Sequence, residues 1–298
     1  MEFIDGLSPE KKKKQEEFAD TDKRVFEGLR LYNDGEKFLY KLTVEGHTKA
    51  QSIESDFGIT IMNELTFLEY DCRKNWWRFR FKELSYTLDR YDDSLIIQIV
   101  EISNKVGEIY QDLDFWVNSF GELKEINNRS QIYNRWERVR EYLSYKHPLS
   151  SYEIIMAKER EMANKELEMQ NIRFIHFIHC YFFPFGRFGS QEKFEVMDMD
   201  RFGSGVAFGV SVNGTTIEKD GKMHRHFKGN MIYNGDIVRI MGSSIREDHA
   251  EVIYQTKADY HNDGFIIEEA NFSFLENIGK TYSMYSNLHL MLEKDGRE

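Results

Sequence analysis

The chain has 298 residues, of which 41% are hydrophobic and 14% aromatic, so it has material for a substantial core and is not a disordered composition. With 40 basic against 51 acidic side chains the formal net charge is −11, which disfavours general binding to phosphate backbones. The only two cysteines, Cys72 and Cys180, are too few for a disulfide framework.

Residues 1–31 are highly charged and lack the apolar stretch of a secretion signal. No run in the chain approaches the about 20 apolar residues of a membrane span, so we expect a cytoplasmic protein with no membrane span. Ser8-Pro9-Glu10 offers a cap followed by proline at the first helical position. The sequence therefore predicts a helical arm over 1–31 and, because no linker composition interrupts the remainder, one α+β domain over 32–298.

Strands are predicted within residues 36–90, where apolar and polar side chains alternate with a period of two. The clearest alternation runs from Trp77 to Lys82, three aromatic residues interleaved with three cations. Two interpretations are open for this strand: a surface for single-stranded nucleic acid, or a core strand whose cations face solvent. The acidic net charge favours the second, and a nucleic-acid partner is not expected.

A mainly helical segment is predicted over 92–183. Two stripes with helical spacing support it: Leu95, Ile99, Ile102 and Val106, then Ile132, Trp136, Val139 and Leu143. Between them, residues 113–126 have the pattern of a β-hairpin. Asn128 and Gln131 resemble a capping box for the second helix. A third helix is predicted from about residue 150, capped by Ser150 with Glu153, to about residue 182, before Pro184.

Residues 190–293 are predicted to be rich in β-structure. Four dipeptides typical of hairpin turns punctuate this region: Asn213-Gly214, Asp220-Gly221, Asn234-Gly235 and Asp263-Gly264. Strands are expected between them, over 206–212, 231–241, 250–257 and 284–292.

His224 and His226 are candidate metal ligands, since both rings share one face of a strand and His249 or His261 offers a third ligand. The competing interpretation is a pair of surface histidines in a basic hairpin, because Lys222, Arg225 and Lys228 would repel a cation. We favour the second interpretation and expect no cofactor.

A second cluster holds His176, His179 and Cys180. Residues three or four apart on a helix are neighbours, so two imidazoles could chelate and His176 could activate a Cys180 nucleophile. The cluster lies within an apolar run, which favours core histidines and a buried thiol instead. We find no P-loop, nucleophile elbow or H-E-x-x-H motif, so an enzyme is not favoured.

These features together predict an α+β fold, in which a large curved antiparallel sheet packs against the central helical segment as an open clamp or half-barrel. Such a concavity would suit an apolar guest. The leading hypothesis is a cytosolic, non-enzymatic binding or adaptor protein that grips a segment of another protein, such as a chaperone or immunity partner of a bacterial toxin or secreted effector. Two alternatives are open: a metal-dependent β-barrel enzyme using His224 and His226, and a structural subunit of a larger protein assembly.

Overall fold

The computed structural model describes residues 32–50, 53–91, 102–149, 151–185, 191–201, 206–246 and 250–294. The predicted arm over 1–31 lies outside these residues. Most of the predicted helix that begins near Leu95 also lies outside them, although residues 102–107 are helical and Ile102 is buried.

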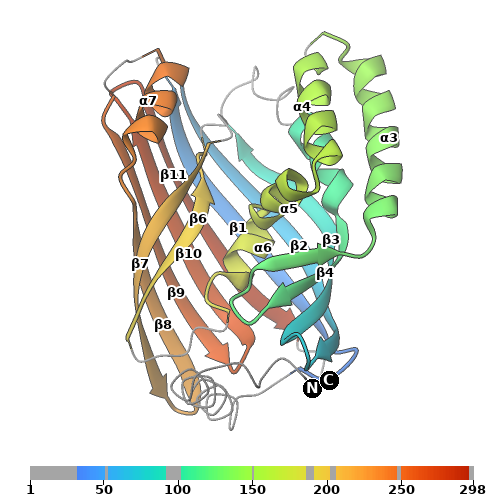
Figure 1. Ribbon diagram of the computed structural model, residues 1–298, viewed down its shortest axis with the longest axis vertical. Helices are drawn as coiled ribbons and strands as arrows, with labels where there is room; N and C mark the ends of the chain where they lie inside the picture. Colours follow the sequence, from blue (N-terminus) through green and yellow to red (C-terminus); the bar gives the residue numbers. More distant parts are fainter. Residues whose placement is uncertain are drawn as a thin grey trace, which may run out of the picture.

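A single antiparallel sheet of eleven strands forms the body of the protein and curves strongly (Figure 1). The order across it is β5-β4-β3-β2-β1-β11-β10-β9-β8-β7-β6, so β1 and β11 pair in the middle and the described strands leave β5 and β6 as two free edges. The predicted large antiparallel sheet is therefore confirmed, and the sheet is not closed. The strands are β1 (Lys37–Ala50), β2 (Ile53–Asp71), β3 (Trp76–Tyr91), β4 (Asp112–Asn118), β5 (Leu123–Ile126), β6 (Gln191–Met199), β7 (Ala207–Lys219), β8 (Lys222–Met231), β9 (Val252–Asp263), β10 (Ile266–Ile278) and β11 (Tyr282–Lys294).

Two of the four predicted hairpin turns are present. Asp220 and Gly221 both have positive φ, 55° and 76°, as a two-residue turn between right-twisted strands requires. Gly264, with φ of 62°, begins the turn that joins β9 to β10.

The other two predicted turns are wrong. Gly214 lies within β7, where an added Cβ would come 2.4 Å from the ring of Phe227, so this glycine makes room for an aromatic neighbour. Asn234 precedes a helix, and its side chain accepts hydrogen bonds from the backbone N–H groups of Asp236 and Ile237. The strand predicted over 231–241 is therefore replaced by α7.

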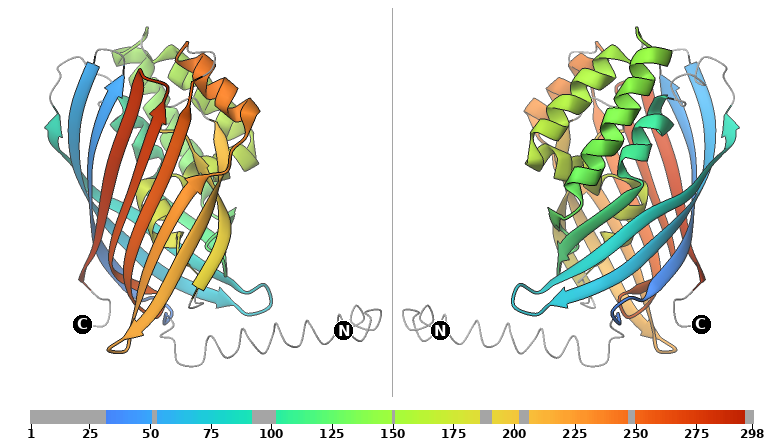
Figure 2. Two further views of the ribbon diagram at one scale, coloured as in Figure 1. Left: turned by 90° about the vertical axis from the view of Figure 1, so that its left-hand side faces the viewer. Right: turned by 90° about the vertical axis from the view of Figure 1, so that its right-hand side faces the viewer.

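Along the chain, most helices fall between the strands β1–β5 and the strands β6–β11, as predicted. They are η1 (Glu108–Tyr110), α3 (Arg129–Lys146), α4 (Tyr152–Ala163), α5 (Lys165–Arg173), α6 (His176–Phe182) and α7 (Gly235–Ser244). Helices α3 and α4 lie side by side near one end of the sheet, where Arg140 pairs with Glu159 at 3.2 Å (Figure 2). The predicted stripe on α3 is confirmed, because Ile132, Trp136, Val139 and Leu143 are all buried.

Two local predictions in this region need correction. Asn128 does not form a capping box; its side chain instead accepts from the Asp114 N–H and donates to the Asp112 carbonyl, which attaches α3 to β4. The helix predicted to run to residue 182 is three helices. It breaks at Asn164, whose extended backbone and side chain cap α5, and again at Phe174–Ile175 before α6.

Helix α6 lies inside the curve of the sheet, so the chain itself fills the middle of the concavity (Figure 1). The Phe177 ring stacks on Phe81 at 5.1 Å between centroids and meets Tyr40 edge-on at 5.6 Å. Phe182 lies 5.2 Å from Phe79. These aromatic contacts provide much of the core and fix α6 against β1 and β3.

The aromatic residues of β3 are core residues, as predicted. Trp77, Phe79 and Phe81 are buried, while Arg78 and Arg80 lie on the opposite face. There Arg78 forms hydrogen-bonded ion pairs with Asp114 and Glu69, and Arg80 does so with Asp112. Arg78 and Arg80 are thus paired with carboxylates of neighbouring strands.

Candidate functional site

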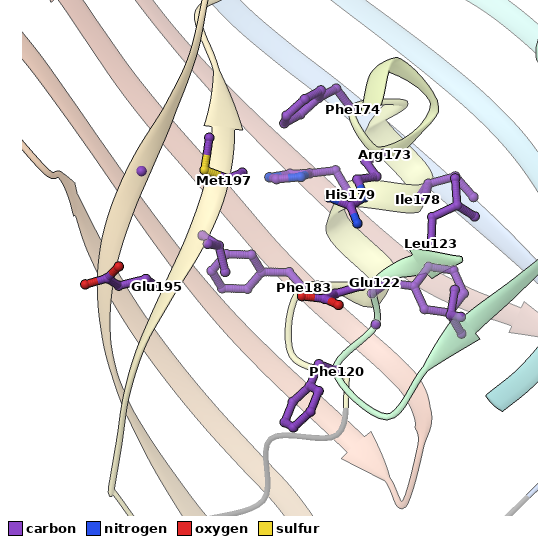
Figure 3. A pocket seen from close by; sticks show the side chains of 15 residues that line it. Phe120, Glu122, Leu123, Arg173, Phe174, Ile178, His179, Phe183, Glu195 and Met197 are labelled. Atoms are coloured by element: carbon purple, nitrogen blue, oxygen red, sulfur yellow. The ribbon is translucent and has the colours of Figure 1, made fainter. Parts of the chain in front are cut away.

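A pocket of about 300 Å³ opens where the two free edges of the sheet approach each other (Figure 3). We call it the seam pocket. Three parts of the chain line it: the end of β4 with the turn into β5, the stretch from the end of α5 to just beyond α6, and strands β6 and β7. The lining residues are Val117, Phe120, Gly121, Glu122, Leu123, Arg173, Phe174, Ile178, His179, Phe182, Phe183, Glu195, Val196, Met197 and Gly209.

The turn between β4 and β5 forms one wall. The Asn118 side chain organises it by accepting hydrogen bonds from the N–H groups of Phe120 and Glu122, at 3.0 and 2.9 Å. Gly121 has a φ of 73°, and an added Cβ would come 2.3 Å from the carbonyl oxygen of Phe182. Glycine is therefore required both for the turn and for its close approach to α6.

Strand β6 forms the opposite wall. Phe194 packs against Phe183 at 6.1 Å, which directs one face of the strand toward the core. Met197 and Glu195 also line the pocket, and Met197 is 52% exposed. Within the described part of the chain β6 pairs with β7 alone, so alternate backbone N–H and C=O groups face the gap.

His179 forms part of the floor. Its ring lies among Phe174, Phe183 and Phe272, at 5.9, 6.1 and 5.1 Å between centroids. Burial lowers the pKa of His179 to about 4, and the nearby Asp198 carboxylate only partly opposes this shift. The imidazole is therefore neutral near pH 7.

A buried network stands behind this histidine. Asp198 accepts hydrogen bonds from the Tyr254 hydroxyl and, at 2.8 Å, from Arg201. Its carboxylate also lies 3.9 Å from Nε2 of His179. The Glu276 carboxylate accepts from the Arg201 backbone N–H at 2.9 Å. These contacts satisfy the charge of Asp198 and hold β6 against β9 and β10, which fixes the wall of the pocket.

Arg173 is the one cation among the described residues that line the seam pocket. Its Nε atom is buried and has no hydrogen-bond partner among the residues that the structure describes. The neighbouring Glu122 carboxylate accepts instead from Lys124 at 2.7 Å and from Asn118 at 2.9 Å. These bonds, the Lys124 bond above all, lower the pKa of Glu122, with a smaller contribution from the charge of Arg173.

The predicted metal pair lies elsewhere, on the outer face of β8. His226 pairs with Asp259, and the His224 ring lies 4.7 Å from that of His261 on the adjacent strand. His261 in turn lies 3.6 Å from Glu269. Within the described ranges, no group of three His, Cys, Asp or Glu residues could hold a metal ion, and His249 lies outside those ranges.

One prediction about the surroundings of this pair was wrong. Arg225 does not lie beside the two histidines: it is buried on the inner face and donates to the carbonyl oxygen of Pro184 at 3.0 Å. The neighbouring strand β9 also brings a carboxylate, Asp259, to His226, which the local sequence did not show.

The second predicted cluster is part of the core. Cys180 is fully buried, and burial raises the pKa of its thiol to about 12. Such a thiol is protonated at neutral pH and is a poor nucleophile. Burial also lowers the pKa of His176 to about 4.

Sequence reasoning missed the seam pocket. The turn at 118–121 and the apolar run around His179 were both recognised, but no signal in either segment indicated that they meet β6. Arg173 was not singled out, because its distinguishing feature, the lack of an ion pair with any residue that the structure describes, depends on the three-dimensional fold.

Comparison with known proteins gives no family. No family model matches the chain, and no curated protein matches it. Among solved structures, one of lipovitellin, which concerns its lipid–protein interactions, aligns with a TM-score of 0.49 and 10% identity over 89% of this chain. The chain spans only 26% of the length of that lipovitellin chain.

Two bacterial structures align less well. An outer membrane channel from Pseudomonas putida F1 gives a TM-score of 0.21 at 5% identity over 90% of this chain and 98% of its own. The translocator domain of the autotransporter NalP from Neisseria meningitidis gives 0.19 at 7% identity over 93% and 96%. Likenesses of this size assign neither a family nor a ligand. Within the described residues, the structure has no helix that is both long enough and apolar enough to span a membrane.

Proposed function

We propose that this protein binds an extended segment of another polypeptide at the open seam of its sheet, where the segment adds a strand to β6. The observation that carries the proposal is that β6, a nine-residue strand, lies at one edge of the sheet formed by the described strands, directly beside an apolar pocket. A chaperone or an immunity partner of a toxin or secreted effector would be one form of such a protein.

The backbone of β6 gives the proposal its first support. An edge strand presents a row of unpaired N–H and C=O groups, and an extended peptide can pair with them without any particular sequence. The outward side chains Lys193 and Glu195 are charged and exposed. Charges of this kind protect an edge from indiscriminate association, so a guest must gain additional contacts to bind well.

The seam pocket supplies those contacts. Side chains of an added strand point alternately to opposite faces, so every second one would be directed toward the helices behind β6. There Ile178, Phe182 and Phe183 offer apolar surface. Because α6 already fills the centre of the concavity, the guest's contacts are restricted to the seam.

Binding of a synthetic peptide tests the proposal. The probe is a fluorescein-labelled nonapeptide amide in which valine and threonine alternate between terminal lysines, whose charge complements the acidic protein. Anisotropy titration should give saturable binding. Hydrogen exchange should show that alternate amides of β6 become protected while those in the centre of the sheet do not change.

The control is the same peptide N-methylated at alternate residues, which removes donors needed for strand pairing without making the peptide less apolar. We expect its binding to fall by at least tenfold. Equal binding of both peptides, or no binding of the unmodified one, would show that β6 does not accept an added strand.

A further inference from the structure

Arg173 differs in its ion pairing from three other arginines near the sheet, although within the described part of the chain a buried Nε without a partner is also found in Arg201. Arg78, Arg129 and Arg201 each form an ion pair with a carboxylate. Arg173, the last residue of α5, forms no such pair with any residue in the described ranges, and its Nε is buried without a hydrogen-bond partner. The residue is half-buried, and its Nε–H group has lost water without gaining a partner among the described residues.

The neighbouring groups form no ion pair with it. Glu122 interacts with the charge of Arg173, but its carboxylate accepts hydrogen bonds from Lys124 and Asn118. Glu195 is exposed on β6. His179 is neutral near pH 7, so among the described lining residues Arg173 carries the only positive charge of a mainly apolar pocket.

We infer that the guest segment carries a carboxylate that Arg173 binds, next to a bulky apolar side chain that occupies the seam pocket. This inference rests on the proposed function and names the class of segment that would be preferred. The planar guanidinium group matches a carboxylate with two parallel hydrogen bonds, which are stronger where water is excluded.

The charge of the lining and the volume of the pocket further limit the class of group that Arg173 can bind. A phosphate carries up to two negative charges, and Glu122 and Glu195 in the same lining would oppose the second one, whereas a carboxylate brings only one. A cavity of about 300 Å³ is at the lower end of ligand sites, which fits one large side chain rather than a whole cofactor.

The carboxylate has two chemical sources: an acidic side chain within the segment, or the carboxyl group at its C-terminus. Two peptide series distinguish them. In the first, the central valine-threonine pair of the nonapeptide is replaced by Phe-Glu or Phe-Gln. In the second, the nonapeptide ends in phenylalanine as a free acid or as an amide.

In the series that contains the true source of the carboxylate, the acidic peptide should bind the wild-type protein about tenfold more tightly than the matching uncharged peptide. This ratio corresponds to a difference in binding free energy of about 1.4 kcal/mol. Arg173→Gln should abolish this difference and leave the uncharged peptides unaffected. Arg173→Lys should restore part of it, because a lysine keeps the charge but not the planar fork. Lys165→Gln, at the exposed start of α5, is the matched control and should leave the tenfold difference intact.

Thermal melting of each variant tests whether folding is retained. The inference is overturned if acid and uncharged peptides bind the wild type equally, if the preference survives in Arg173→Gln, or if a phosphoserine peptide binds more tightly than both acids. The first of these results, with the valine-threonine peptide still bound, would leave strand addition at β6 standing. Failure of every peptide to bind would instead remove the proposed function itself.

Discussion

Replacing Phe177 by alanine tests whether α6 is an integral part of the core. The side chain is 1% exposed and touches Phe81, Tyr40 and Tyr181, with ring centroids 5.1, 5.6 and 5.6 Å away. Truncation removes the buried ring and leaves a cavity between α6 and the sheet, so we expect Phe177→Ala to lower the free energy of unfolding by about 3–5 kcal/mol. That is a large part of the about 5–15 kcal/mol typical of a domain.

Urea denaturation followed by far-UV circular dichroism measures the change. Phe177→Leu keeps most of the apolar volume and should cost about 1–2 kcal/mol. Tyr145→Ala, on a side chain that is 91% exposed on α3, is the control and should change stability by less than about 0.5 kcal/mol. If Phe177→Ala had the same midpoint and slope as Tyr145→Ala, α6 would not be packed in the core and the seam pocket would lose its floor.

Three further predictions concern the core and the histidines. Trp136→Ala should destabilise by about 3–5 kcal/mol in the same assay, since Trp136 is buried at the centre of the α3 stripe, and an unchanged midpoint would contradict this packing. Because the pKa of His179 is lowered to about 4, the unfolded chain binds a proton below about pH 6.5 that the folded protein does not. His179 alone should therefore lower stability by up to about 3 kcal/mol between pH 6.5 and 4, and His179→Gln should remove this part of the decline while the similar contribution of His176 is kept. Elemental analysis of protein purified without a histidine tag should find less than one transition metal per chain, and replacing both His224 and His226 by alanine should change stability little; one bound equivalent that the double variant loses would favour the metal-enzyme alternative.

Local patterns predicted those parts of the fold that depend on neighbours in sequence. In β1 and β3, apolar residues alternate because one face of each strand is turned to the core. In α3, the apolar stripe through Trp136 marks the face of the helix that is turned to the core. Asn-Gly pairs were less reliable, because Asn234 serves equally well as a helix cap and Gly214 accommodates the ring of Phe227.

The site was not predictable in the same way. The walls of the seam pocket come from residues 117–123, 173–183 and 195–209, and their meeting depends on the curvature of all eleven strands. The predicted surroundings of His224 and His226 were partly wrong for the same reason: strand alternation placed Arg225 on the other face, and Asp259 approaches from β9.

The pairing of β1 with β11 has a consequence for synthesis on the ribosome. The hydroxyl of Ser286 donates to the carbonyl oxygen of Glu45, 241 positions earlier in the chain, so the middle of the sheet joins its most distant strands. At a translation rate of about 5–20 residues per second, roughly 10–50 s pass between the synthesis of β1 and that of β11. During this time one edge of β1, with its alternating apolar side chains, can pair with any other strand. Nascent chains arrested before residue 282 should therefore depend on holding chaperones, and synthesis of β11 should be followed by slow pairing of the two central strands.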